Sequence, residues 1–189
     1  MTQPIRSDAQ ANRARVVEAA RAVFTEHGLD ADMRAIAERA SVGVGTIYRN
    51  FAAKDDLVHA IMDSCIADAL ADVLQLRTIS DGRELISALA RTAFEHAERN
   101  GALFTAIGDA QGPARQDPPP EIMDVIGAMF ARAAALGVLR ADIPAGFLAR
   151  FLATLFPAYL ELRRSFPAEM VSAHLTELFL SAVMTADPR

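Results

Sequence analysis

The residues whose types and spacing could do chemistry gather near the N-terminus, between positions 34 and 57. This stretch reads RAIAERASVGVGTIYRNFAAKDDL and holds two short segments with helical periodicity, separated by a break at residues 41–43. Two short helices joined by a tight turn form a helix-turn-helix, and the second helix of that unit can lie in the major groove of DNA. The chemistry predicted here is therefore recognition of a nucleic acid.

The second of these helices supplies the candidate recognition surface. Ile47 is expected to face the core of the unit, which leaves the other side chains free for DNA. Gly45 lets the backbone approach the groove, and Val44 or Thr46 can contact a thymine methyl group or a base edge. The predicted surface consists of Val44, Gly45, Thr46, Tyr48 and Arg49.

Two further side chains suit the phosphate backbone. Tyr48 can donate its hydroxyl, and Lys54, the only lysine of the chain, stands at the predicted N-terminus of a long helix. Amide groups at a helix N-terminus also favour an anion. Phosphate contacts fix the register of a protein on the duplex and do not read its sequence. We therefore expect Tyr48 and Lys54 to position the unit on DNA.

The elements that must position these residues are helices. Apolar residues recur at three- and four-residue steps from Val16 to Phe24, and Gly28 follows as a C-cap, which predicts a first helix over about 8–27. Asp32 stands where the N-cap of a two-turn helix is expected. After the recognition segment, a helix over about 54–74 is long enough to link two modules.

The rest of the chain is predicted to be helical as well. Capping, glycine and proline signals place the starts of five more helices near Asp81, Ala102, Pro118, Pro144 and Pro167. Residues 111–120 hold four prolines and predict an exposed loop, and Pro157 is expected to kink its helix. The count is about nine helices and no strand, which is an all-α fold.

Composition agrees with this prediction and excludes several classes. Of 189 residues, 52% are hydrophobic and 6% aromatic, and the apolar share is mostly Ala and Leu, which favours helix over strand. Apolar stretches such as 147–160 are interrupted by Arg150 and Pro157 and fall short of the roughly 18 residues of a membrane span. Cys65 is the single cysteine, and the first ten residues lack the apolar segment of a signal peptide. We expect a cytoplasmic protein without membrane contact.

Charge is distributed unevenly along the chain. The net charge is -5, yet residues 1–56 carry eight basic and eight acidic side chains. The whole net negative charge therefore lies in residues 57–189. A neutral N-terminal segment on an acidic body indicates that the first quarter, and not the rest, meets a polyanion.

Residues 13–57 hold a set of positions whose residue types, order and spacing are distinctive: Ala19, Ala20, Phe24, Gly28, Ile36, Ala37, Ala40, Val42, Gly45, Thr46, Ile47, Tyr48, Phe51, Lys54 and Leu57. In these positions the first quarter of the chain resembles the N-terminal DNA-binding domain of the TetR family of bacterial repressors. The resemblance implies that Thr46, Tyr48 and Lys54 contact DNA.

Three positions depart from the family's pattern. Asp32 replaces the usual Thr or Ser cap and keeps the capping chemistry. Ser41 stands where glycine is commonest in the turn, and it costs about 1 kcal/mol if that site needs a positive φ. Val44 stands where a polar residue is frequent, which bears on base preference.

The remaining helices are similar in number and order to the family's ligand-binding and dimerisation domain, which is an analogy of fold. In that domain the last two long helices pair with a second subunit. The interface candidates are Leu148, Leu152, Leu155, Leu175, Leu178 and Phe179. Met and Phe make adaptable apolar walls, so an effector cavity is expected, with plain core as the alternative for each residue. Its candidates are Met62, Cys65, Phe94, Phe104, Met123, Met129, Phe130, Phe147 and Phe151, with His96, Glu98 and Asp109 as polar groups that orient the ligand.

These observations predict a helix-turn-helix DNA-binding domain over 1–53 and a ligand-binding and dimerisation domain over 54–189. They imply a homodimeric transcriptional regulator, a repressor released from an inverted-repeat operator in double-stranded DNA by a small apolar effector, without a cofactor.

The alternative is a helical small-molecule or metal-binding protein without regulatory DNA binding. Two pairs, His59 with Asp63 and His174 with Glu177, each lie on one helix face and could supply two metal ligands. They would make a site only if they converged, and no metal is expected. The sequence contains no nucleophile motif, glycine-rich phosphate loop or CxxC, so we expect no enzyme.

Overall fold

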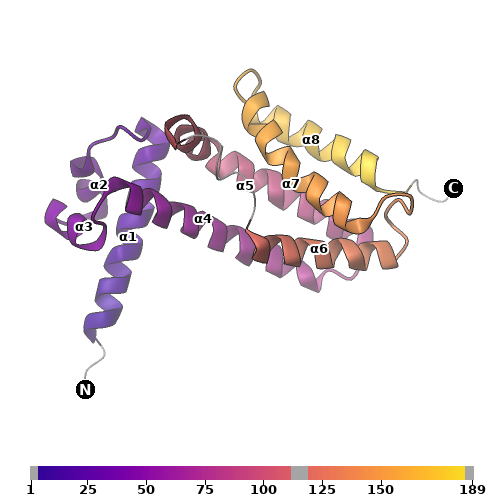
Figure 1. Ribbon diagram of the computed structural model, residues 1–189, viewed down its shortest axis with the longest axis horizontal. Coiled ribbons are helices and arrows are strands. Elements are labelled where there is room, and N and C mark those ends of the chain that lie inside the picture. Colours follow the sequence, from indigo (N-terminus) through magenta and orange to yellow (C-terminus); the bar gives the residue numbers. More distant parts are fainter. Residues whose placement is uncertain (1–3, 112–118, 186–189) are drawn as a thin grey trace. The chain divides into compact units, whose positions relative to one another are not determined.

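The computed structural model describes residues 4–111 and 119–185, with the backbone alone for 4–8 and 109–111. The helices are α1 (Pro4–His27), α2 (Met33–Ala40), α3 (Val44–Asn50), α4 (Lys54–Gln75), α5 (Gly82–Gln111), α6 (Pro120–Ala135), α7 (Ala145–Leu162) and α8 (Ala168–Val183) (Figure 1). A short 3-10 helix, η1 (Leu76–Thr78), follows α4. The described residues contain no strand, only an isolated β-bridge between Leu139 and Met184. The all-α prediction is confirmed.

The expected break at Gly101 is wrong, because α5 is one continuous helix of 30 residues. The described part of the chain therefore has eight α-helices and not nine. A glycine weakens a helix interior by about 1 kcal/mol but does not end it. Here glycine serves close packing, since a Cβ at this position would lie 2.4 Å from Nη1 of Arg163. The loop expected over 111–120 falls largely outside the described residues.

The helices form two compact units, each described by itself. The N-terminal unit comprises residues 1–66 and 102–114, and the C-terminal unit comprises 67–101 and 115–189. Helices α4 and α5 each contribute one part to either unit. Compact packing units are not functional domains, so the division at residues 53 and 54 stays a prediction.

The N-terminal unit has its own apolar core. Helix α2 packs against α1 and α3, and Figure 1 shows α2 and α3 beside the C-terminal half of α1. Its fully buried side chains are Val16, Ala20, Phe24, Ile36, Ile47, Leu57, Ile61 and Leu103. Ile36 of α2 and Ile47 of α3 share this core with α1, so the core holds α3 in place within the unit, as a recognition helix requires.

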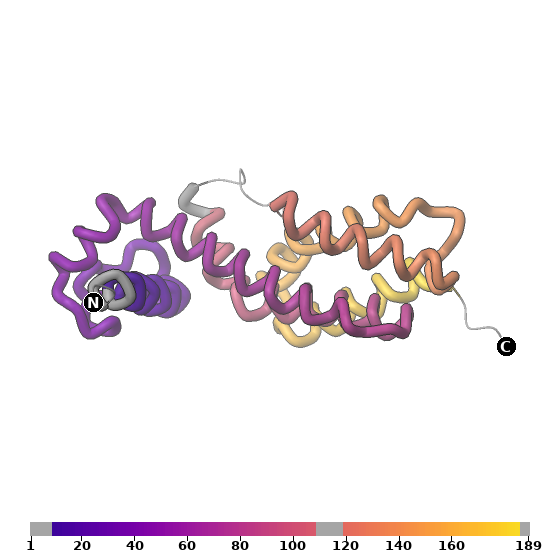
Figure 2. The backbone as a smooth tube through the Cα atoms, turned by 90° about the horizontal axis from the view of Figure 1, so that it is seen from below, coloured from indigo at the N-terminus to yellow at the C-terminus, as the bar shows by residue number. Residues whose placement is uncertain are grey.

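The C-terminal unit is built on packing of α6 against α7 and of α7 against α8. Figure 2 shows the tubes of α6 and α7, coloured salmon and orange, as neighbours. Phe179 of α8 is buried, with its ring centroid 6.3 Å from that of Phe130 and 5.9 Å from that of Phe151. These separations are typical of favourable aromatic pairs. The three rings join α6, α7 and α8.

Among the described helices, α7 is the one that is long and apolar enough to cross a membrane by length and composition. Core helices meet the same criterion, and α7 packs against two neighbours. Among its apolar side chains, Leu148 and Leu152 are buried whereas Phe147 is 61% exposed. Phe147 is thus a large apolar side chain that the rest of the unit leaves uncovered.

Candidate nucleic-acid interface

The turn between α2 and α3 is fixed by its caps. Asp32 is the N-cap of α2, and its carboxylate accepts a hydrogen bond from the Arg34 amide at 2.9 Å. Ser41 ends the helix in the left-handed region, with φ +54°. Its amide donates to the Glu38 carbonyl and that of Val42 donates to the Ala37 carbonyl, each at 3.0 Å. The predicted Asp32 cap is confirmed, and the condition under which Ser41 carries a cost, a positive φ, is met.

Helix α3 turns one side chain inward and presents the rest. Ile47 is fully buried in the core, as predicted, whereas Tyr48 is 54% exposed. Gly45 and Arg49 are exposed and Thr46 is half-buried. The exception is Val44, which packs partly against the core. The structure therefore brings four of the five recognition candidates onto one accessible surface.

Hydrogen bonds along α3 organise this surface. Arg49 donates from Nε to the Gly45 carbonyl at 3.2 Å and from Nη2 to the Thr46 hydroxyl oxygen at 3.0 Å. The side-chain amide of Asn50 donates from Nδ2 to the Thr46 carbonyl at 2.8 Å. Because the Thr46 oxygen accepts from Arg49, its own hydrogen can point to an acceptor on DNA. Sequence reasoning missed Asn50, although its spacing of four from Thr46 was visible.

Lys54 is half-buried at the first position of α4. Its Nζ donates to the Ala31 carbonyl at 3.3 Å and lies 5.5 Å from the centroid of the Phe24 ring. An ammonium has three donors, and the structure gives a hydrogen-bond partner to one of them. The nearby amide of Ala53 donates to the Asp56 carboxylate at 3.0 Å. Of the two anion-binding features predicted for this helix start, the amino group is better placed than the amides.

A second connection holds α2 on α1. Both terminal nitrogens of Arg39 donate to the Glu26 carboxylate, at 2.8 Å each. This hydrogen bonding holds the pKa of Glu26 below its usual value. In the same unit the Arg13 guanidinium lies 4.8 Å from the centroid of the Phe51 ring. No local sequence signal could have paired Arg39 with a residue 13 positions earlier.

The nine effector candidates do not share one unit. Met62 and Cys65 are buried in the core of the N-terminal unit, and Phe104 packs against it. The other six belong to the C-terminal unit. There Phe94, Met129 and Phe130 are buried, Met123 and Phe151 are partly buried, and Phe147 is exposed. Their role in ligand binding stays a prediction.

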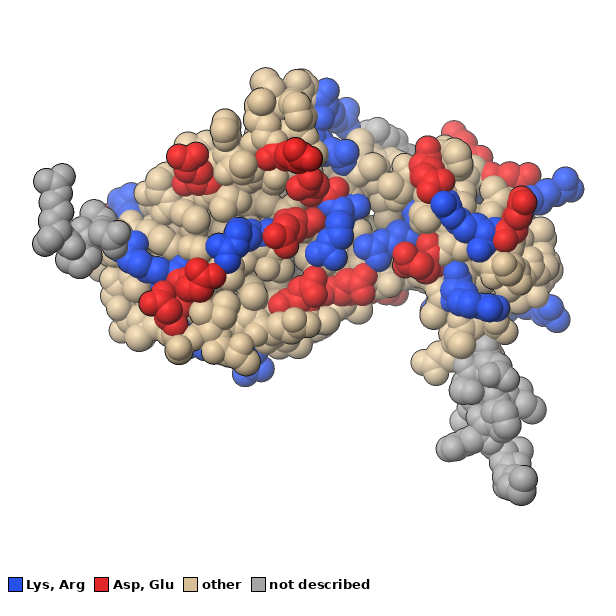
Figure 3. All heavy atoms as spheres, turned by 180° about the vertical axis from the view of Figure 1, so that it is seen from behind, with Lys and Arg blue, Asp and Glu red and all other residues tan. Residues whose placement is uncertain are grey.

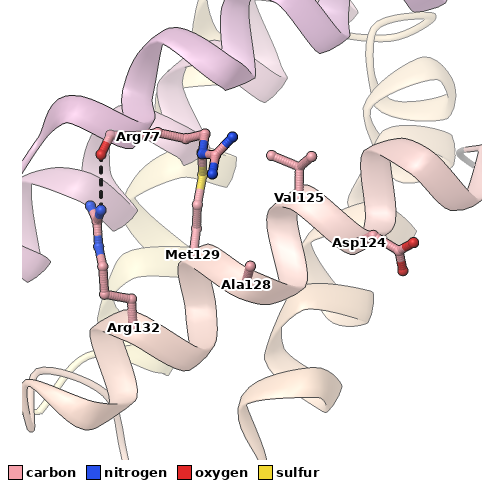
Figure 4. A pocket seen from close by; sticks show the side chains of 6 residues that line it. All are labelled: Arg77, Asp124, Val125, Ala128, Met129 and Arg132. Carbon is pink, nitrogen blue, oxygen red and sulfur yellow. Dashed lines mark hydrogen bonds between the residues drawn. The ribbon is translucent and has the colours of Figure 1, made fainter.

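A pocket of about 360 Å³ lies in the C-terminal unit, and Met129 is the one effector candidate that lines it. Its other lining residues are Arg77, Asp124, Val125, Ala128 and Arg132 (Figure 4). Arg132 closes one end, because Nη1 donates to the Arg77 carbonyl at 2.9 Å and Nη2 donates to the Ile79 carbonyl. The pocket is therefore lined by three apolar side chains together with two arginines and one aspartate.

The polar effector candidates already have partners inside the C-terminal unit. His96 is buried, and its Nε2 lies 2.8 Å from Oδ2 of Asp72 on α4. That hydrogen bond is the main reason that the pKa of Asp72 is lowered. Glu98 accepts a hydrogen bond from the Ser172 hydroxyl at 3.3 Å. The side chain of Asp109 lies outside the described residues.

The interface candidates divide into two groups. Leu148, Leu152 and Phe179 are buried inside their own subunit, so their expected place between subunits is wrong. Leu178 is 64% exposed, and Leu155 and Leu175 are partly buried. Periodicity locates an apolar face, but it does not tell whether that face meets its own core or a partner. Sequence reasoning also missed the exposed Phe166 and Met170.

The metal-binding alternative finds no geometric support. His59, Asp63, His174 and Glu177 are all exposed. Within the part of the chain that the structure describes, no three His, Cys, Asp or Glu side chains gather as metal ligands would.

A family model described as "Bacterial regulatory proteins, tetR family" matches residues 16–61. Among curated proteins, the HTH-type transcriptional regulator UidR of Escherichia coli (strain K12) is 36% identical over 63 residues, which is 33% of this chain and 32% of that protein. An HTH-type transcriptional regulator of Staphylococcus aureus (strain USA300) is 39% identical over 59 residues, 31% of this chain and 32% of the relative. The match thus spans about a third of the length of these relatives.

Solved structures match over nearly the whole chain. A TetR transcriptional regulator from Streptomyces coelicolor is 29% identical with a TM-score of 0.65, covering 92% of this chain and 99% of that one. The TetR transcription regulatory protein from Mycobacterium vanbaalenii is 25% identical with a TM-score of 0.70, covering 96% and 100%. Together with the helix-turn-helix and its exposed α3, these matches agree on one family. The N-terminal part of the chain, residues 16–61, matches the tetR family of bacterial regulatory proteins, and the chain as a whole has the fold of solved TetR regulators.

Proposed function

We propose that this protein is a sequence-specific DNA-binding transcriptional regulator that acts as a homodimer on an inverted-repeat operator. The observation that carries the proposal is the arrangement of α3, which buries Ile47 and presents Tyr48 on an exposed face. A recognition helix needs this division between core and groove. The curated relatives are HTH-type transcriptional regulators, which supports the same function.

The residues of α3 and of the start of α4 contact two different parts of DNA, the base edges and the phosphates. Gly45 and Thr46 approach base edges, and Arg49 adds a cation that also orients Thr46. Tyr48 and Lys54 contact phosphates. Val44 is partly buried against the core, so it influences base preference by setting the position of α3. Its accessible methyl surface can also contact a base.

The experiment that tests this role is selection of bound sequences from random DNA, followed by affinity measurements on the selected site. Lys54→Ala should weaken binding to all sequences and lower the slope of log affinity against log salt by about 1. Arg91→Ala, which removes an exposed cation of the C-terminal unit, is the matched control. If Lys54→Ala and Tyr48→Phe both leave affinity unchanged, this docking of α3 is refuted.

Dimerisation through α7 and α8 rests on their uncovered apolar side chains. Phe147 and Leu178 are the most exposed large hydrophobic residues of the described chain. Isolated exposed apolar residues are ordinary, but two adjacent helices that each present one fit a subunit interface. Figure 3 shows acidic and basic side chains interspersed over the face that it draws, beside uncharged areas.

Regulation by an effector completes the proposal. A small apolar molecule that binds the C-terminal domain and releases the operator must have different affinities for the two conformations of the dimer. Helix α4 is the proposed lever, because it begins at Lys54 and continues to Gln75 without a break. Such a repressor works in the cytoplasm, where the DNA is. Thermal stabilisation by a compound library, followed by operator binding with each hit, tests it: hits that never change operator affinity contradict a switch.

A further inference from the structure

Helix α7 carries two buried polar atoms that have no hydrogen-bond partner within the described structure. Tyr159 is fully buried, and its hydroxyl is unpaired. One turn later, Nη1 of Arg163 is buried and unpaired as well. Native proteins pair nearly all of their buried polar groups, so an unpaired one calls for an explanation. A third such atom, Nε of Arg132, belongs to a guanidinium whose other two nitrogens both donate to carbonyls.

The two side chains that hold these atoms approach the same position of α5, Gly101. Residues 159 and 163 are four apart, so their side chains lie on the same face of the helix. A Cβ built on Gly101 would lie 2.4 Å from Nη1 of Arg163 and 3.2 Å from Cε1 of Tyr159. Both side chains therefore press against the backbone of α5 where a glycine makes room for them. This explains why a glycine is present inside that long helix.

The charges around this point favour an anion. Burial is the main reason that the pKa of Tyr159 is raised, so at neutral pH its hydroxyl keeps its proton and can donate. The guanidinium of Arg163 is always charged. The carboxylate of Glu98 is close enough to raise the pKa of Tyr159 further, but it accepts a hydrogen bond from the Ser172 hydroxyl. Two donors, one of them cationic, are left together without an acceptor.

A helix C-terminus alone does not account for the pair. Arg163 is the C-cap of α7, where a cation interacts favourably with the helix dipole. That preference explains an arginine at this position, but it explains neither the buried orientation of Nη1 nor the unpaired hydroxyl of Tyr159. A phenylalanine would fill the same space without leaving a polar group unsatisfied.

We propose that the hydroxyl of Tyr159 and Nη1 of Arg163 bind the carboxylate of the effector, which is therefore an organic acid. This rests on the proposed function, in which the C-terminal domain binds an effector, and it specifies the chemical class of that ligand. Arginine and carboxylate form strong charge-assisted hydrogen bonds, and the Tyr159 hydroxyl adds a second donor. His96 and Glu98 are less suited to this role because each already has a partner.

The test uses matched probes that differ in charge only at one end: octanoate with octanamide, and phenylacetate with phenylacetamide. The chain has two tyrosines and no tryptophan, so tyrosine labelled with ¹³C at Cζ gives one signal for Tyr159 and one for Tyr48. We expect a carboxylate to raise the melting temperature and to shift the Tyr159 signal alone. The matching amide should bind at least about 10-fold more weakly, since one charge-assisted hydrogen bond is lost.

Two variants and a control locate the binding. Tyr159→Phe and Arg163→Gln should each weaken carboxylate binding by about 10-fold or more. Arg164→Gln is the matched control, because Arg164 is the next residue and its guanidinium is exposed beside Glu161; it should bind carboxylates as the unmodified protein does. Without a probe, Tyr159→Phe should not lower the melting temperature, because its hydroxyl has no partner to lose.

Three results would overturn the inference. One is a clear loss of stability of the probe-free Tyr159→Phe protein, which would show that the hydroxyl is already paired. Another is equal binding of carboxylates and amides, and the last is binding of neither. Operator binding without any probe is measured in parallel on the selected DNA. Failure of DNA binding would reject the proposed function, whereas intact DNA binding with no carboxylate preference would reject this inference alone.

Discussion

The two units of this protein differ in where their polar groups and apolar side chains find partners. In the N-terminal unit, the groups that shape the site find partners within the unit: Asp32 with the Arg34 amide, Arg49 with Thr46, and Arg39 with Glu26. In the C-terminal unit, the Tyr159 hydroxyl is unpaired and Leu178 is exposed. A recognition surface is complete in one chain, whereas a surface that awaits a ligand or a second subunit is not.

The largest expected effect is a loss of stability that is confined to the C-terminal unit. It follows from removing the ring of Phe179, which joins three helices of that unit. Phe179→Ala should destabilise that unit by about 3–5 kcal/mol, because Phe179 is buried between Phe130 and Phe151. Urea unfolding followed at the Tyr159 and Tyr48 signals measures it, and Tyr159 should respond first. Phe166→Ala, at an exposed ring, is the control. Equal losses in both variants would contradict the packing described here.

The next effect concerns the exposed apolar side chains of α7 and α8, Phe147 and Leu178. Leu178→Glu places a charge where a partner helix is proposed, so the protein should become monomeric. Operator affinity should fall by roughly 100-fold or more, because two half-sites then bind independently. Sedimentation and DNA titration measure both changes. Leu136→Glu, at an exposed leucine that follows α6, should leave the dimer intact. A dimeric Leu178→Glu protein with full affinity would place the interface elsewhere.

A smaller effect tests the turn of the helix-turn-helix. Ser41 has φ +54°, a conformation that costs a side-chain-bearing residue about 1 kcal/mol relative to glycine. Ser41→Gly should therefore raise the free energy of unfolding of the N-terminal unit by about that amount. Ser41→Ala is the matched comparison and should bring no such gain. If urea unfolding gives the two variants equal stability, the positive φ of Ser41 does not strain the backbone.

The smallest effect depends on pH. The hydrogen bond from Arg39 holds the pKa of Glu26 below its usual 4.5. A carboxyl whose pKa is lowered by folding adds stability that is present above the unfolded pKa and is lost as the pH falls through the folded one. Glu26→Gln should thus lower the melting temperature slightly at pH 7, and the difference should vanish on acidification from roughly pH 5 to pH 3. Glu18→Gln, beside Arg21 at 3.9 Å, is the control.

Sequence reasoning succeeded where the signals are local. The cap at Asp32, the turn at Ser41 and the inward Ile47 all lie within 16 residues, and each follows from backbone conformation or periodicity. The all-helical fold followed from the same signals. The hydrogen bond of Lys54 to Ala31 did not, because it joins residues 23 apart and depends on how α4 starts beside α1.

The errors in the C-terminal unit have a common physical cause. Gly101 was predicted to end a helix, because its actual role, close approach to Tyr159 and Arg163, appears only in the packed structure. Leu148 and Leu152 were assigned to a partner although they pack inward. In both cases the sequence indicates which positions are small or apolar, while tertiary packing decides what they touch.

Lys54 also makes the proposed interface chemically addressable. Because it is the only lysine, its side chain is the one ε-amine that an acylating reagent can modify. The hydrogen bond to Ala31 and the half-buried position should slow that reaction, and bound phosphate should slow it further. The acylated fraction of Lys54, measured by mass spectrometry of a peptide around residue 54, thus reports whether DNA occupies the site. Acetylation of the same amine would remove the one lysine charge that this surface has.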